Sequence, residues 1–159
     1  MIIYCLFFIS CLALLSWIDF RTFILPNIIT IPLIILGFSW NLLSPDKFCS
    51  YLDSFYGALL GYFLIYFIDV FYFLISKKHG IGMGDAKLLS GIGATLGWQI
   101  VLPILFFSAI LGLVGGLIWL NLKSLTKNEP FPFGPFLCIV ASFAVLLKTF
   151  NSELISSFL

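Results

Sequence analysis

An uncharged apolar stretch runs from Ile100 to Leu122 and reads IVLPILFFSAILGLVGGLIWLNL. About 20 consecutive apolar residues are enough for one α-helix to cross the hydrocarbon core of a bilayer. This stretch therefore predicts a transmembrane helix. Comparable apolar runs lie on both sides of it, at Ile2–Ile18, Ile28–Leu43, Phe55–Ile75 and Phe136–Phe150.

The segment that precedes this stretch, Ala86–Trp98, is apolar but too short to span a bilayer comfortably. The whole of Ala86–Leu122 is too long for one helix, so we predict a short fourth helix that turns at Gly97-Trp98-Gln99. The sequence then predicts an all-α polytopic integral membrane protein with about six transmembrane helices. We find no repeat or linker and expect a single domain over residues 1–159. No basic segment precedes the first run, so we expect a mature transmembrane helix rather than a cleaved signal peptide.

The composition agrees with a membrane protein. Hydrophobic residues make up 62% of the chain and charged residues 9%, against roughly 45–50% and about 25% in soluble domains. These values exclude a soluble enzyme, a disordered chain and a coiled coil. The net charge of +1 argues against nucleic-acid binding, because nucleic-acid-binding proteins carry an excess of basic residues. Four cysteines form no CxxC pair and have no histidine at ligand spacing, so we expect no metal, no cofactor and no disulfide framework: Cys5, Cys11, Cys49 and Cys138.

The charged loop residues predict the orientation, because cytoplasmic loops carry an excess of lysine and arginine. With the amino terminus outside, the two outside basic residues are Lys47 and Lys148. The inside loops then hold the other six: Arg21, Lys77, Lys78, Lys87, Lys123 and Lys127. We therefore predict that both termini lie outside.

Two carboxylates stand at predicted helix ends. Asp19 closes the first helix and Asp85 opens the fourth, and because two spans separate them both lie at the inside face. Two carboxyl groups that share one proton can activate water, one as base and the other as acid. Gly82 and Gly84 would let the backbone approach a peptide closely and adopt the positive φ of a tight turn. The alternative is that Asp19 pairs with Arg21 while Asp85 only caps its helix.

Three separated motifs support the interpretation of Asp19 and Asp85 as a catalytic pair. In chain order they are Asp19 with Leu25-Pro26-Asn27, then Gly82-Met83-Gly84-Asp85-Ala86-Lys87, then Pro132-Phe133-Gly134-Pro135, with Gly91-x-Gly93 and Gly97-Trp98 between the last two. Together they resemble the type IV prepilin peptidases, a family of intramembrane aspartic proteases with a Gly-x-Gly-Asp motif. The resemblance covers essentially the whole chain.

The resemblance implies an aspartic endopeptidase in the bacterial inner membrane. Such enzymes remove a short basic leader from type IV prepilins, or from the pseudopilins of type II secretion, at the cytoplasmic face. The expected partners are thus these leader peptides and the lipid bilayer, and no metal is implied. Asp19 and Asp85 match the two catalytic aspartates. The residues expected to support them are Gly82, Gly84, Lys87, Arg21, Pro26 and Asn27. An equally supported interpretation of Lys87 is that its charge sets the orientation of the chain in the membrane.

The chain also differs from the family. Full-length members carry an amino-terminal cytoplasmic region with paired CxxC motifs, which is associated with zinc and N-methylation. Because this chain starts at its first apolar run, we expect peptidase activity without N-methylation. His79 stands where many members have an acidic residue. Asp69 has no counterpart, and we expect it to be a buried carboxylate bonded to a tyrosine or serine rather than a third catalytic group.

The alternative function is a non-enzymatic membrane protein, either a small transporter or an inactive pilus-assembly partner. A transporter should have charged or broken-helix sites near the membrane midplane, and only Asp69 qualifies. An inactive relative should have lost an aspartate or a motif glycine, whereas Asp19 and Gly82-Met83-Gly84-Asp85 are intact.

Overall fold

The structure is a computed structural model that describes residues 1–77, 82–123 and 132–158. In these residues every regular element is an α-helix, which confirms the predicted all-α class. The helices are α1 (Ile2–Thr22), α2 (Asn27–Leu43), α3 (Tyr51–Ser76), α4 (Met83–Leu96), α5 (Trp98–Lys123) and α6 (Gly134–Phe158).

Among the described residues, three helical segments are long and apolar enough to cross a membrane: Ile2–Thr22, Tyr51–Ser76 and Trp98–Ile118. Two further segments, Asn27–Leu43 and Gly134–Phe150, are shorter apolar helices. Large apolar side chains cover the outside of the bundle, as at Ile3 and Leu43, which are 85% and 80% exposed. An outer surface of this kind is suited to lipid rather than to water, so the chain is a polytopic membrane protein.

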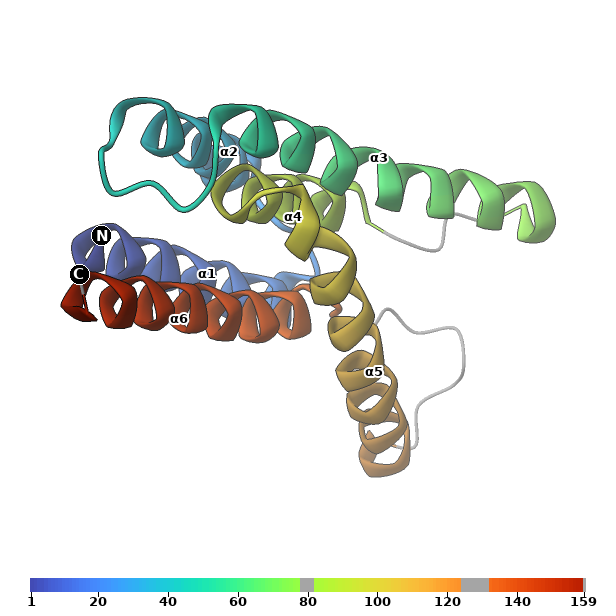
Figure 1. Ribbon diagram of the computed structural model, residues 1–159. Helices are drawn as coiled ribbons and strands as arrows, with labels where there is room; N and C mark the ends of the chain where they lie inside the picture. The colour runs from blue at the N-terminus through green and yellow to red at the C-terminus, as the bar shows by residue number, and fades with distance from the viewer. Residues whose placement is uncertain (78–81, 124–131, 159) are drawn as a thin grey trace.

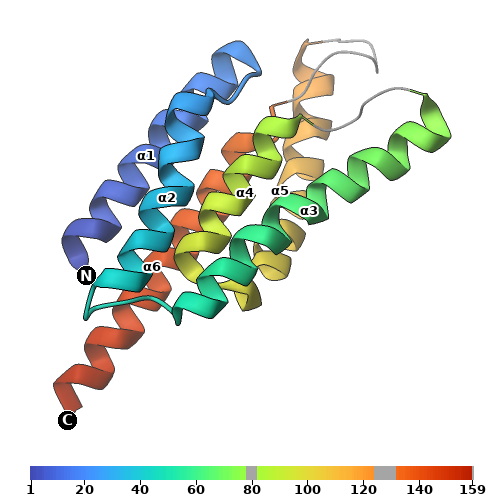
Figure 2. The same cartoon turned by 90° about the horizontal axis from the view of Figure 1, so that it is seen from above.

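The helices pack as two groups (Figure 1). One group is α4 with α2 and α3, which pack against it more extensively than any other helices do. The other group is α1 with α6, which lie antiparallel and side by side (Figures 1 and 2). Helix α5 begins directly after α4, contacts both α3 and α6, and leaves the bundle at a steep angle in Figure 1. We call these the α2–α3–α4 group and the α1–α6 pair.

Helix α4 is the centre of its group, with every residue from Leu88 to Leu96 buried. Its glycines make this possible, because neighbouring helices approach where a side chain would stand. A Cβ on Gly61 would lie 2.6 Å from the carbonyl oxygen of Leu89, and one on Gly93 would meet the backbone of Gly57. The small residues Gly57 and Gly61 therefore permit the close packing of α3 on α4.

The turn between α4 and α5 lies where the sequence predicts it. Gly97 has a φ of +92°, a conformation that other residues adopt only with strain. Its N–H donates to the carbonyl of Gly93 at 2.8 Å, and α5 starts at the next residue, Trp98. The long apolar run from Ala86 is thus divided between two helices.

The basic residues of the described chain divide between the two ends of the bundle. The end formed by the carboxyl terminus of α1 and the amino terminus of α4, here called the aspartate end, holds Arg21, Lys77 and Lys87 (Figure 2). The opposite end, here called the far end, holds Lys47 and Lys148. This separation follows the predicted division of basic residues. Lys78 and Lys127 lie outside the described residues.

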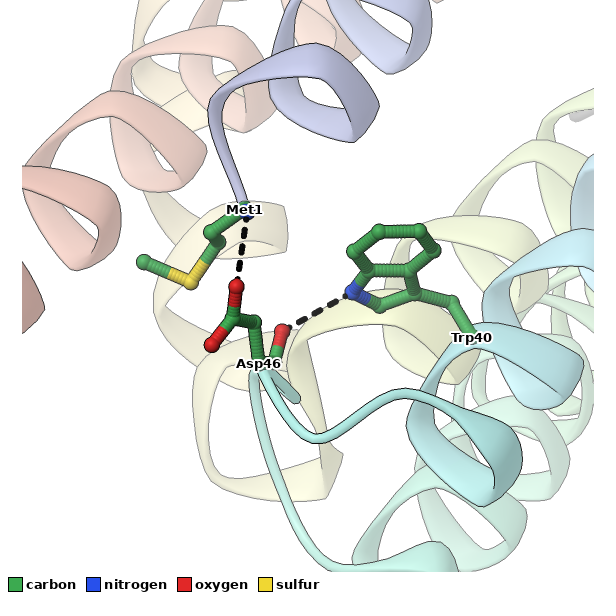
Figure 3. A network of polar contacts seen from close by, with 3 residues as sticks. All are labelled: Met1, Trp40 and Asp46. Carbon is green, nitrogen blue, oxygen red and sulfur yellow. Dashed lines mark hydrogen bonds and ion pairs between the residues drawn. The ribbon is translucent and has the colours of Figure 1, made fainter.

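A polar network ties the amino terminus to the loop of residues 44–50 at the far end (Figure 3). The amino-terminal ammonium of Met1 forms an ion pair with the Asp46 carboxylate at 3.2 Å. The indole N–H of Trp40, on α2, donates to the Asp46 carbonyl at 3.1 Å. The network therefore joins the start of α1 to the α2–α3–α4 group.

Candidate active site

Asp19 lies in the last turn of α1, on the stripe that faces the interior. The buried residues of this helix recur at helical spacing, at Phe8, Leu12, Leu15 and Asp19. Asp19 is 5% exposed. Its Oδ2 accepts a hydrogen bond from the backbone N–H of Gly134 at 3.1 Å. Because Gly134 is the first residue of α6, Asp19 is held at a helix amino terminus, where a negative charge is favoured.

Asp85 is the third residue of α4 and is 9% exposed. The residue that caps the helix is Gly82, and the Asp85 N–H donates to the Gly82 carbonyl at 3.0 Å. The alternative in which Asp85 serves as the helix cap is therefore wrong. The other part of that alternative also fails, because the Arg21 guanidinium lies 4.5 Å from the centre of the Trp17 ring and no ion pair joins described residues Arg21 and Asp19.

Both carboxylates line one cavity of about 380 Å³ at the aspartate end, within the range of ligand pockets. They come from α1 and α4, two helices that are far apart in sequence. The rest of the lining comes from the chain after α1 and from the start of α4: Phe23, Ile24, Leu25, Pro26, Asn27, Gly82, Met83, Gly84 and Lys87. The structure thus brings together the two aspartates that the sequence places at one face.

Three predicted supporting residues connect α2 and α4 at this cavity. The Lys87 ammonium donates to the Asn27 side-chain oxygen at 2.7 Å. Asn27 begins α2, and Pro26 caps that helix with an extended backbone. Lys87 therefore fastens the first turns of two helices to one another, and it lies beside the carboxylates as a lining residue.

The two motif glycines act differently from the expectation. Gly82 has a φ of −69° and Gly84 lies within helix α4, so the predicted positive φ is wrong for both. Gly84 serves a close approach, because a Cβ there would lie 2.9 Å from the Leu25 Cβ. Among the described residues, the nearest atom to a Cβ on Gly82 would be the Gly84 nitrogen at 4.0 Å, so Gly82 faces open space there. Gly82 therefore leaves room in the cavity.

Three other expectations concern Arg21, Asp69 and His79. Arg21 is exposed and does not line it. Asp69 is 1% exposed and lies on the face of α3 that also carries Gly57 and Gly61 toward α4, but it does not line the cavity either. His79 lies outside the described residues.

Size does not single out this cavity. A groove of about 870 Å³ lies between α3 and the start of α5 at the far end, and Asp53 is the one carboxylate in its lining. Among described residues, no three histidine, cysteine, aspartate or glutamate side chains gather in a way that could hold a metal ion. The pair of buried carboxylates is what marks the smaller cavity as the candidate active site.

Gly134 belongs to the Pro132-Phe133-Gly134-Pro135 motif, but its contact with Asp19 was not predicted from the sequence. A Cβ at this position would lie 2.6 Å from Asp19 Oδ2 and 3.0 Å from Asp19 Cγ. A usable signal was present, because Pro-Phe-Gly-Pro precedes the sixth predicted helix on the same face as Asp85. The backbone contact itself has no sequence signature.

We predict that Gly134→Ala lowers the turnover of any substrate at this site by about tenfold or more. The added methyl group displaces the Asp19 carboxylate, and a misplacement of about 1 Å can cost about 100-fold. Activity should be measured with the thermal stability of the purified protein. Gly82→Ala is the matched control for the folded state, because its Cβ would meet open space. Unchanged turnover in Gly134→Ala would contradict the role of this contact.

Comparisons with known proteins identify the family of this chain. The model of the type IV leader peptidase family matches residues 6–117. The prepilin leader peptidase/N-methyltransferase of Pectobacterium carotovorum is 35% identical over 146 residues, which is 92% of this chain and 52% of that protein. The proteins of the same name from Aeromonas hydrophila and Pseudomonas aeruginosa are each 36% identical over 135 residues, 85% of this chain and 46% of theirs.

This chain spans about half the length of the curated relatives that it matches. No solved structure matches it significantly. The family model nevertheless covers most of the chain, including both aspartates and every supporting residue named above. The chain therefore belongs to the type IV leader peptidase family.

Proposed function

We propose that this chain is a membrane-embedded aspartic endopeptidase that removes the short basic leader from type IV prepilins or type II secretion pseudopilins. The observation that carries the proposal is the shared cavity of Asp19 and Asp85 in a member of the leader peptidase family. Two buried carboxylates in one cavity are the groups that aspartic proteolysis requires.

The proposed reaction uses one ionised and one protonated carboxyl group, because two like charges at close range do not both ionise cheaply. The ionised group takes a proton from water, and the resulting hydroxide forms a bond to the carbonyl carbon of the scissile peptide. The protonated group gives its proton to the carbonyl oxygen. When the tetrahedral intermediate collapses, the C–N bond breaks and the departing nitrogen receives the proton taken from water. One hydroxyl of the intermediate returns its proton to the carboxylate that gave one, which restores the carbonyl group and the starting state of the pair.

The described residues have separate parts in this proposal. The Gly134 N–H holds the Asp19 carboxylate in place. Lys87 and Asn27 hold the start of α4, and with it Asp85, against α2. Gly82 leaves open space at the cavity for the extended backbone of a leader. These groups hold the pair and leave room for a peptide.

We further propose that the aspartate end faces the cytoplasm, in the inner membrane of a bacterium. Arg21, Lys77 and Lys87 lie at this end, and an excess of lysine and arginine is typical of the cytoplasmic side. A leader peptide that stays in the cytoplasm would reach the aspartates from this side. Labelling of single cysteines placed at the two ends, in intact cells, tests this orientation.

The proposed activity is tested with the chain in bacterial membranes that lack other leader peptidases. Prepilins and pseudopilins with basic leaders are added, and mass spectrometry identifies each product. Cleavage directly after the leader glycine supports the proposal, and a substrate with a bulky residue in place of that glycine serves as the control. If the inserted chain cleaves none of the substrates, the proposal is overturned.

A further inference from the structure

The two aspartates belong to different parts of the bundle. Asp19 lies on α1 and is bonded to the start of α6, so it belongs to the α1–α6 pair. Asp85 belongs to the α2–α3–α4 group, and the two parts contact one another much less than their own helices do (Figure 1). The approach of Asp19 to Asp85 therefore depends on how these two parts are held together.

Polar contacts join the two parts at the far end, where α4 finishes. The Lys148 ammonium, on α6, donates to the Leu96 carbonyl at 2.8 Å. The Tyr4 hydroxyl, on α1, shares a hydrogen bond with Thr95 Oγ1 at 3.3 Å. Tyr4 is 7% exposed and Thr95 is fully buried, so water does not compete for this bond.

The neighbouring carbonyls of α4 are occupied from within its own group. The Asn41 side-chain amide donates to the carbonyls of Ala94 and Thr95 at 3.0 and 2.8 Å. Its side-chain oxygen accepts from the backbone N–H of Phe48 at 2.9 Å. The Leu96 carbonyl is thus the one in this turn that receives a cation from the other part, and a cation is favoured at a helix carboxyl end.

The Lys148–Leu96 contact acts on the aspartates through two helices. Helix α4 carries Asp85 near its start and Leu96 at its end, about 16 Å apart at 1.5 Å per residue. Helix α6 carries Gly134, which holds Asp19, at its start, and Lys148 about 21 Å further on. Because each helix moves as a rod, a bond between Lys148 and Leu96 fixes the relation between their opposite ends.

We infer that Lys148 and Tyr4 are positioning residues that hold the α1–α6 pair on the α2–α3–α4 group and thereby set the approach of Asp19 to Asp85. This inference rests on the proposed peptidase function. Neither residue lines the cavity, and both act from the far end of the bundle.

The first test compares Lys148→Met with Lys148→Arg and with Lys47→Met, an exposed lysine of the 44–50 loop at the same end. Loss of a hydrogen bond from a charged donor is expected to lower kcat by about tenfold, with KM within about twofold of wild type. Arginine should restore most of kcat, and Lys47→Met should match wild type. Tyr4→Phe removes only the hydroxyl and should lower kcat by a few fold. This variant provides the test if Lys148→Met does not fold.

The second test does not depend on activity. Spin labels at Ile139→Cys on α6 and Phe71→Cys on α3, both exposed, report the distance between the two parts in a background without the four native cysteines. We expect a broader or shifted distance distribution in Lys148→Met and an unchanged one in Lys47→Met.

The outcomes separate this inference from the proposed function. If Lys148→Met and Tyr4→Phe both leave kcat unchanged, or if the spin-label distances stay as in wild type, the positioning role is overturned. A loss of kcat that Lys148→Arg does not restore overturns it as well. If the wild-type chain cleaves no prepilin, the proposed function fails, and the inference that rests on it fails too, whereas the distances still report whether Lys148 joins the two parts.

Discussion

Gly93→Val is expected to destabilise the folded bundle by about 3 kcal/mol or more. Oversized residues in a packed core usually cost about 1–3 kcal/mol, and here the obstacle is backbone rather than a movable side chain. A Cβ on Gly93 would lie 2.6 Å from the Gly57 carbonyl carbon. Helices α3 and α4 would have to separate, which would also expose the polar groups that Ser54 and Ser90 bury between them.

The measurement is thermal or denaturant unfolding of the purified variant in detergent micelles. Gly82→Ala is the control, because Gly82 directly precedes the same helix and a Cβ on it would meet open space among the described residues. If Gly93→Val unfolds at the same temperature as wild type, α3 and α4 do not pack through this contact.

Asp19→Asn and Asp85→Asn are each expected to lower the rate of prepilin cleavage by about 1,000-fold or more. General acid–base catalysis contributes about 100- to 10,000-fold, and in a pair each group depends on the other, so either loss removes both roles. Asparagine keeps the shape of the side chain and can still accept the hydrogen bond from the Gly134 N–H. The effect should therefore fall on the reaction and not on folding.

Initial rates in membranes with equal amounts of inserted protein provide the measurement. Lys47→Met is the control, because Lys47 is an exposed charged residue at the far end and its variant should cleave as wild type does. Full activity in either of the two asparagine variants would show that the remaining aspartate does not need a partner.

Much of the fold can be predicted from the sequence because it depends on local properties. Runs of apolar residues define the helices, and the observed α1, α3 and α5 extend each predicted span by a few residues. The short α4 and the break at Gly97 follow from length alone, since one helix cannot contain Ala86–Leu122. The common face of Asp19 and Asp85 follows from an even number of crossings.

Contacts between distant segments could not be predicted in the same way. Gly134 is a backbone donor to Asp19, and any residue type offers a backbone N–H, so the sequence contains no sign of this bond. Arg21 lies close to Asp19 in sequence but on another face of α1, where it stacks on Trp17. Lys148 was predicted only as a charge at an outside membrane boundary, whereas its ammonium reaches the end of α4.

The roles of the motif glycines show the same limit. Glycine permits a positive φ, a close approach or simply open space, and the sequence does not distinguish between these. At Gly97 the structure uses the positive φ, at Gly84 it uses the close approach to Leu25, and at Gly82 it leaves space.

The central claim is that Asp19 and Asp85 together hold a tetrahedral carbon formed from a peptide bond. The most direct test is the inhibition constant of a leader peptide whose scissile carbonyl is replaced by a difluoroketone, which hydrates to a tetrahedral diol. Transition-state analogues bind at least about 100-fold more tightly than substrates, so we expect such a gain for the wild-type chain and its loss in Asp19→Asn and in Asp85→Asn. Equal affinity for the diol in wild type and both variants would contradict the account.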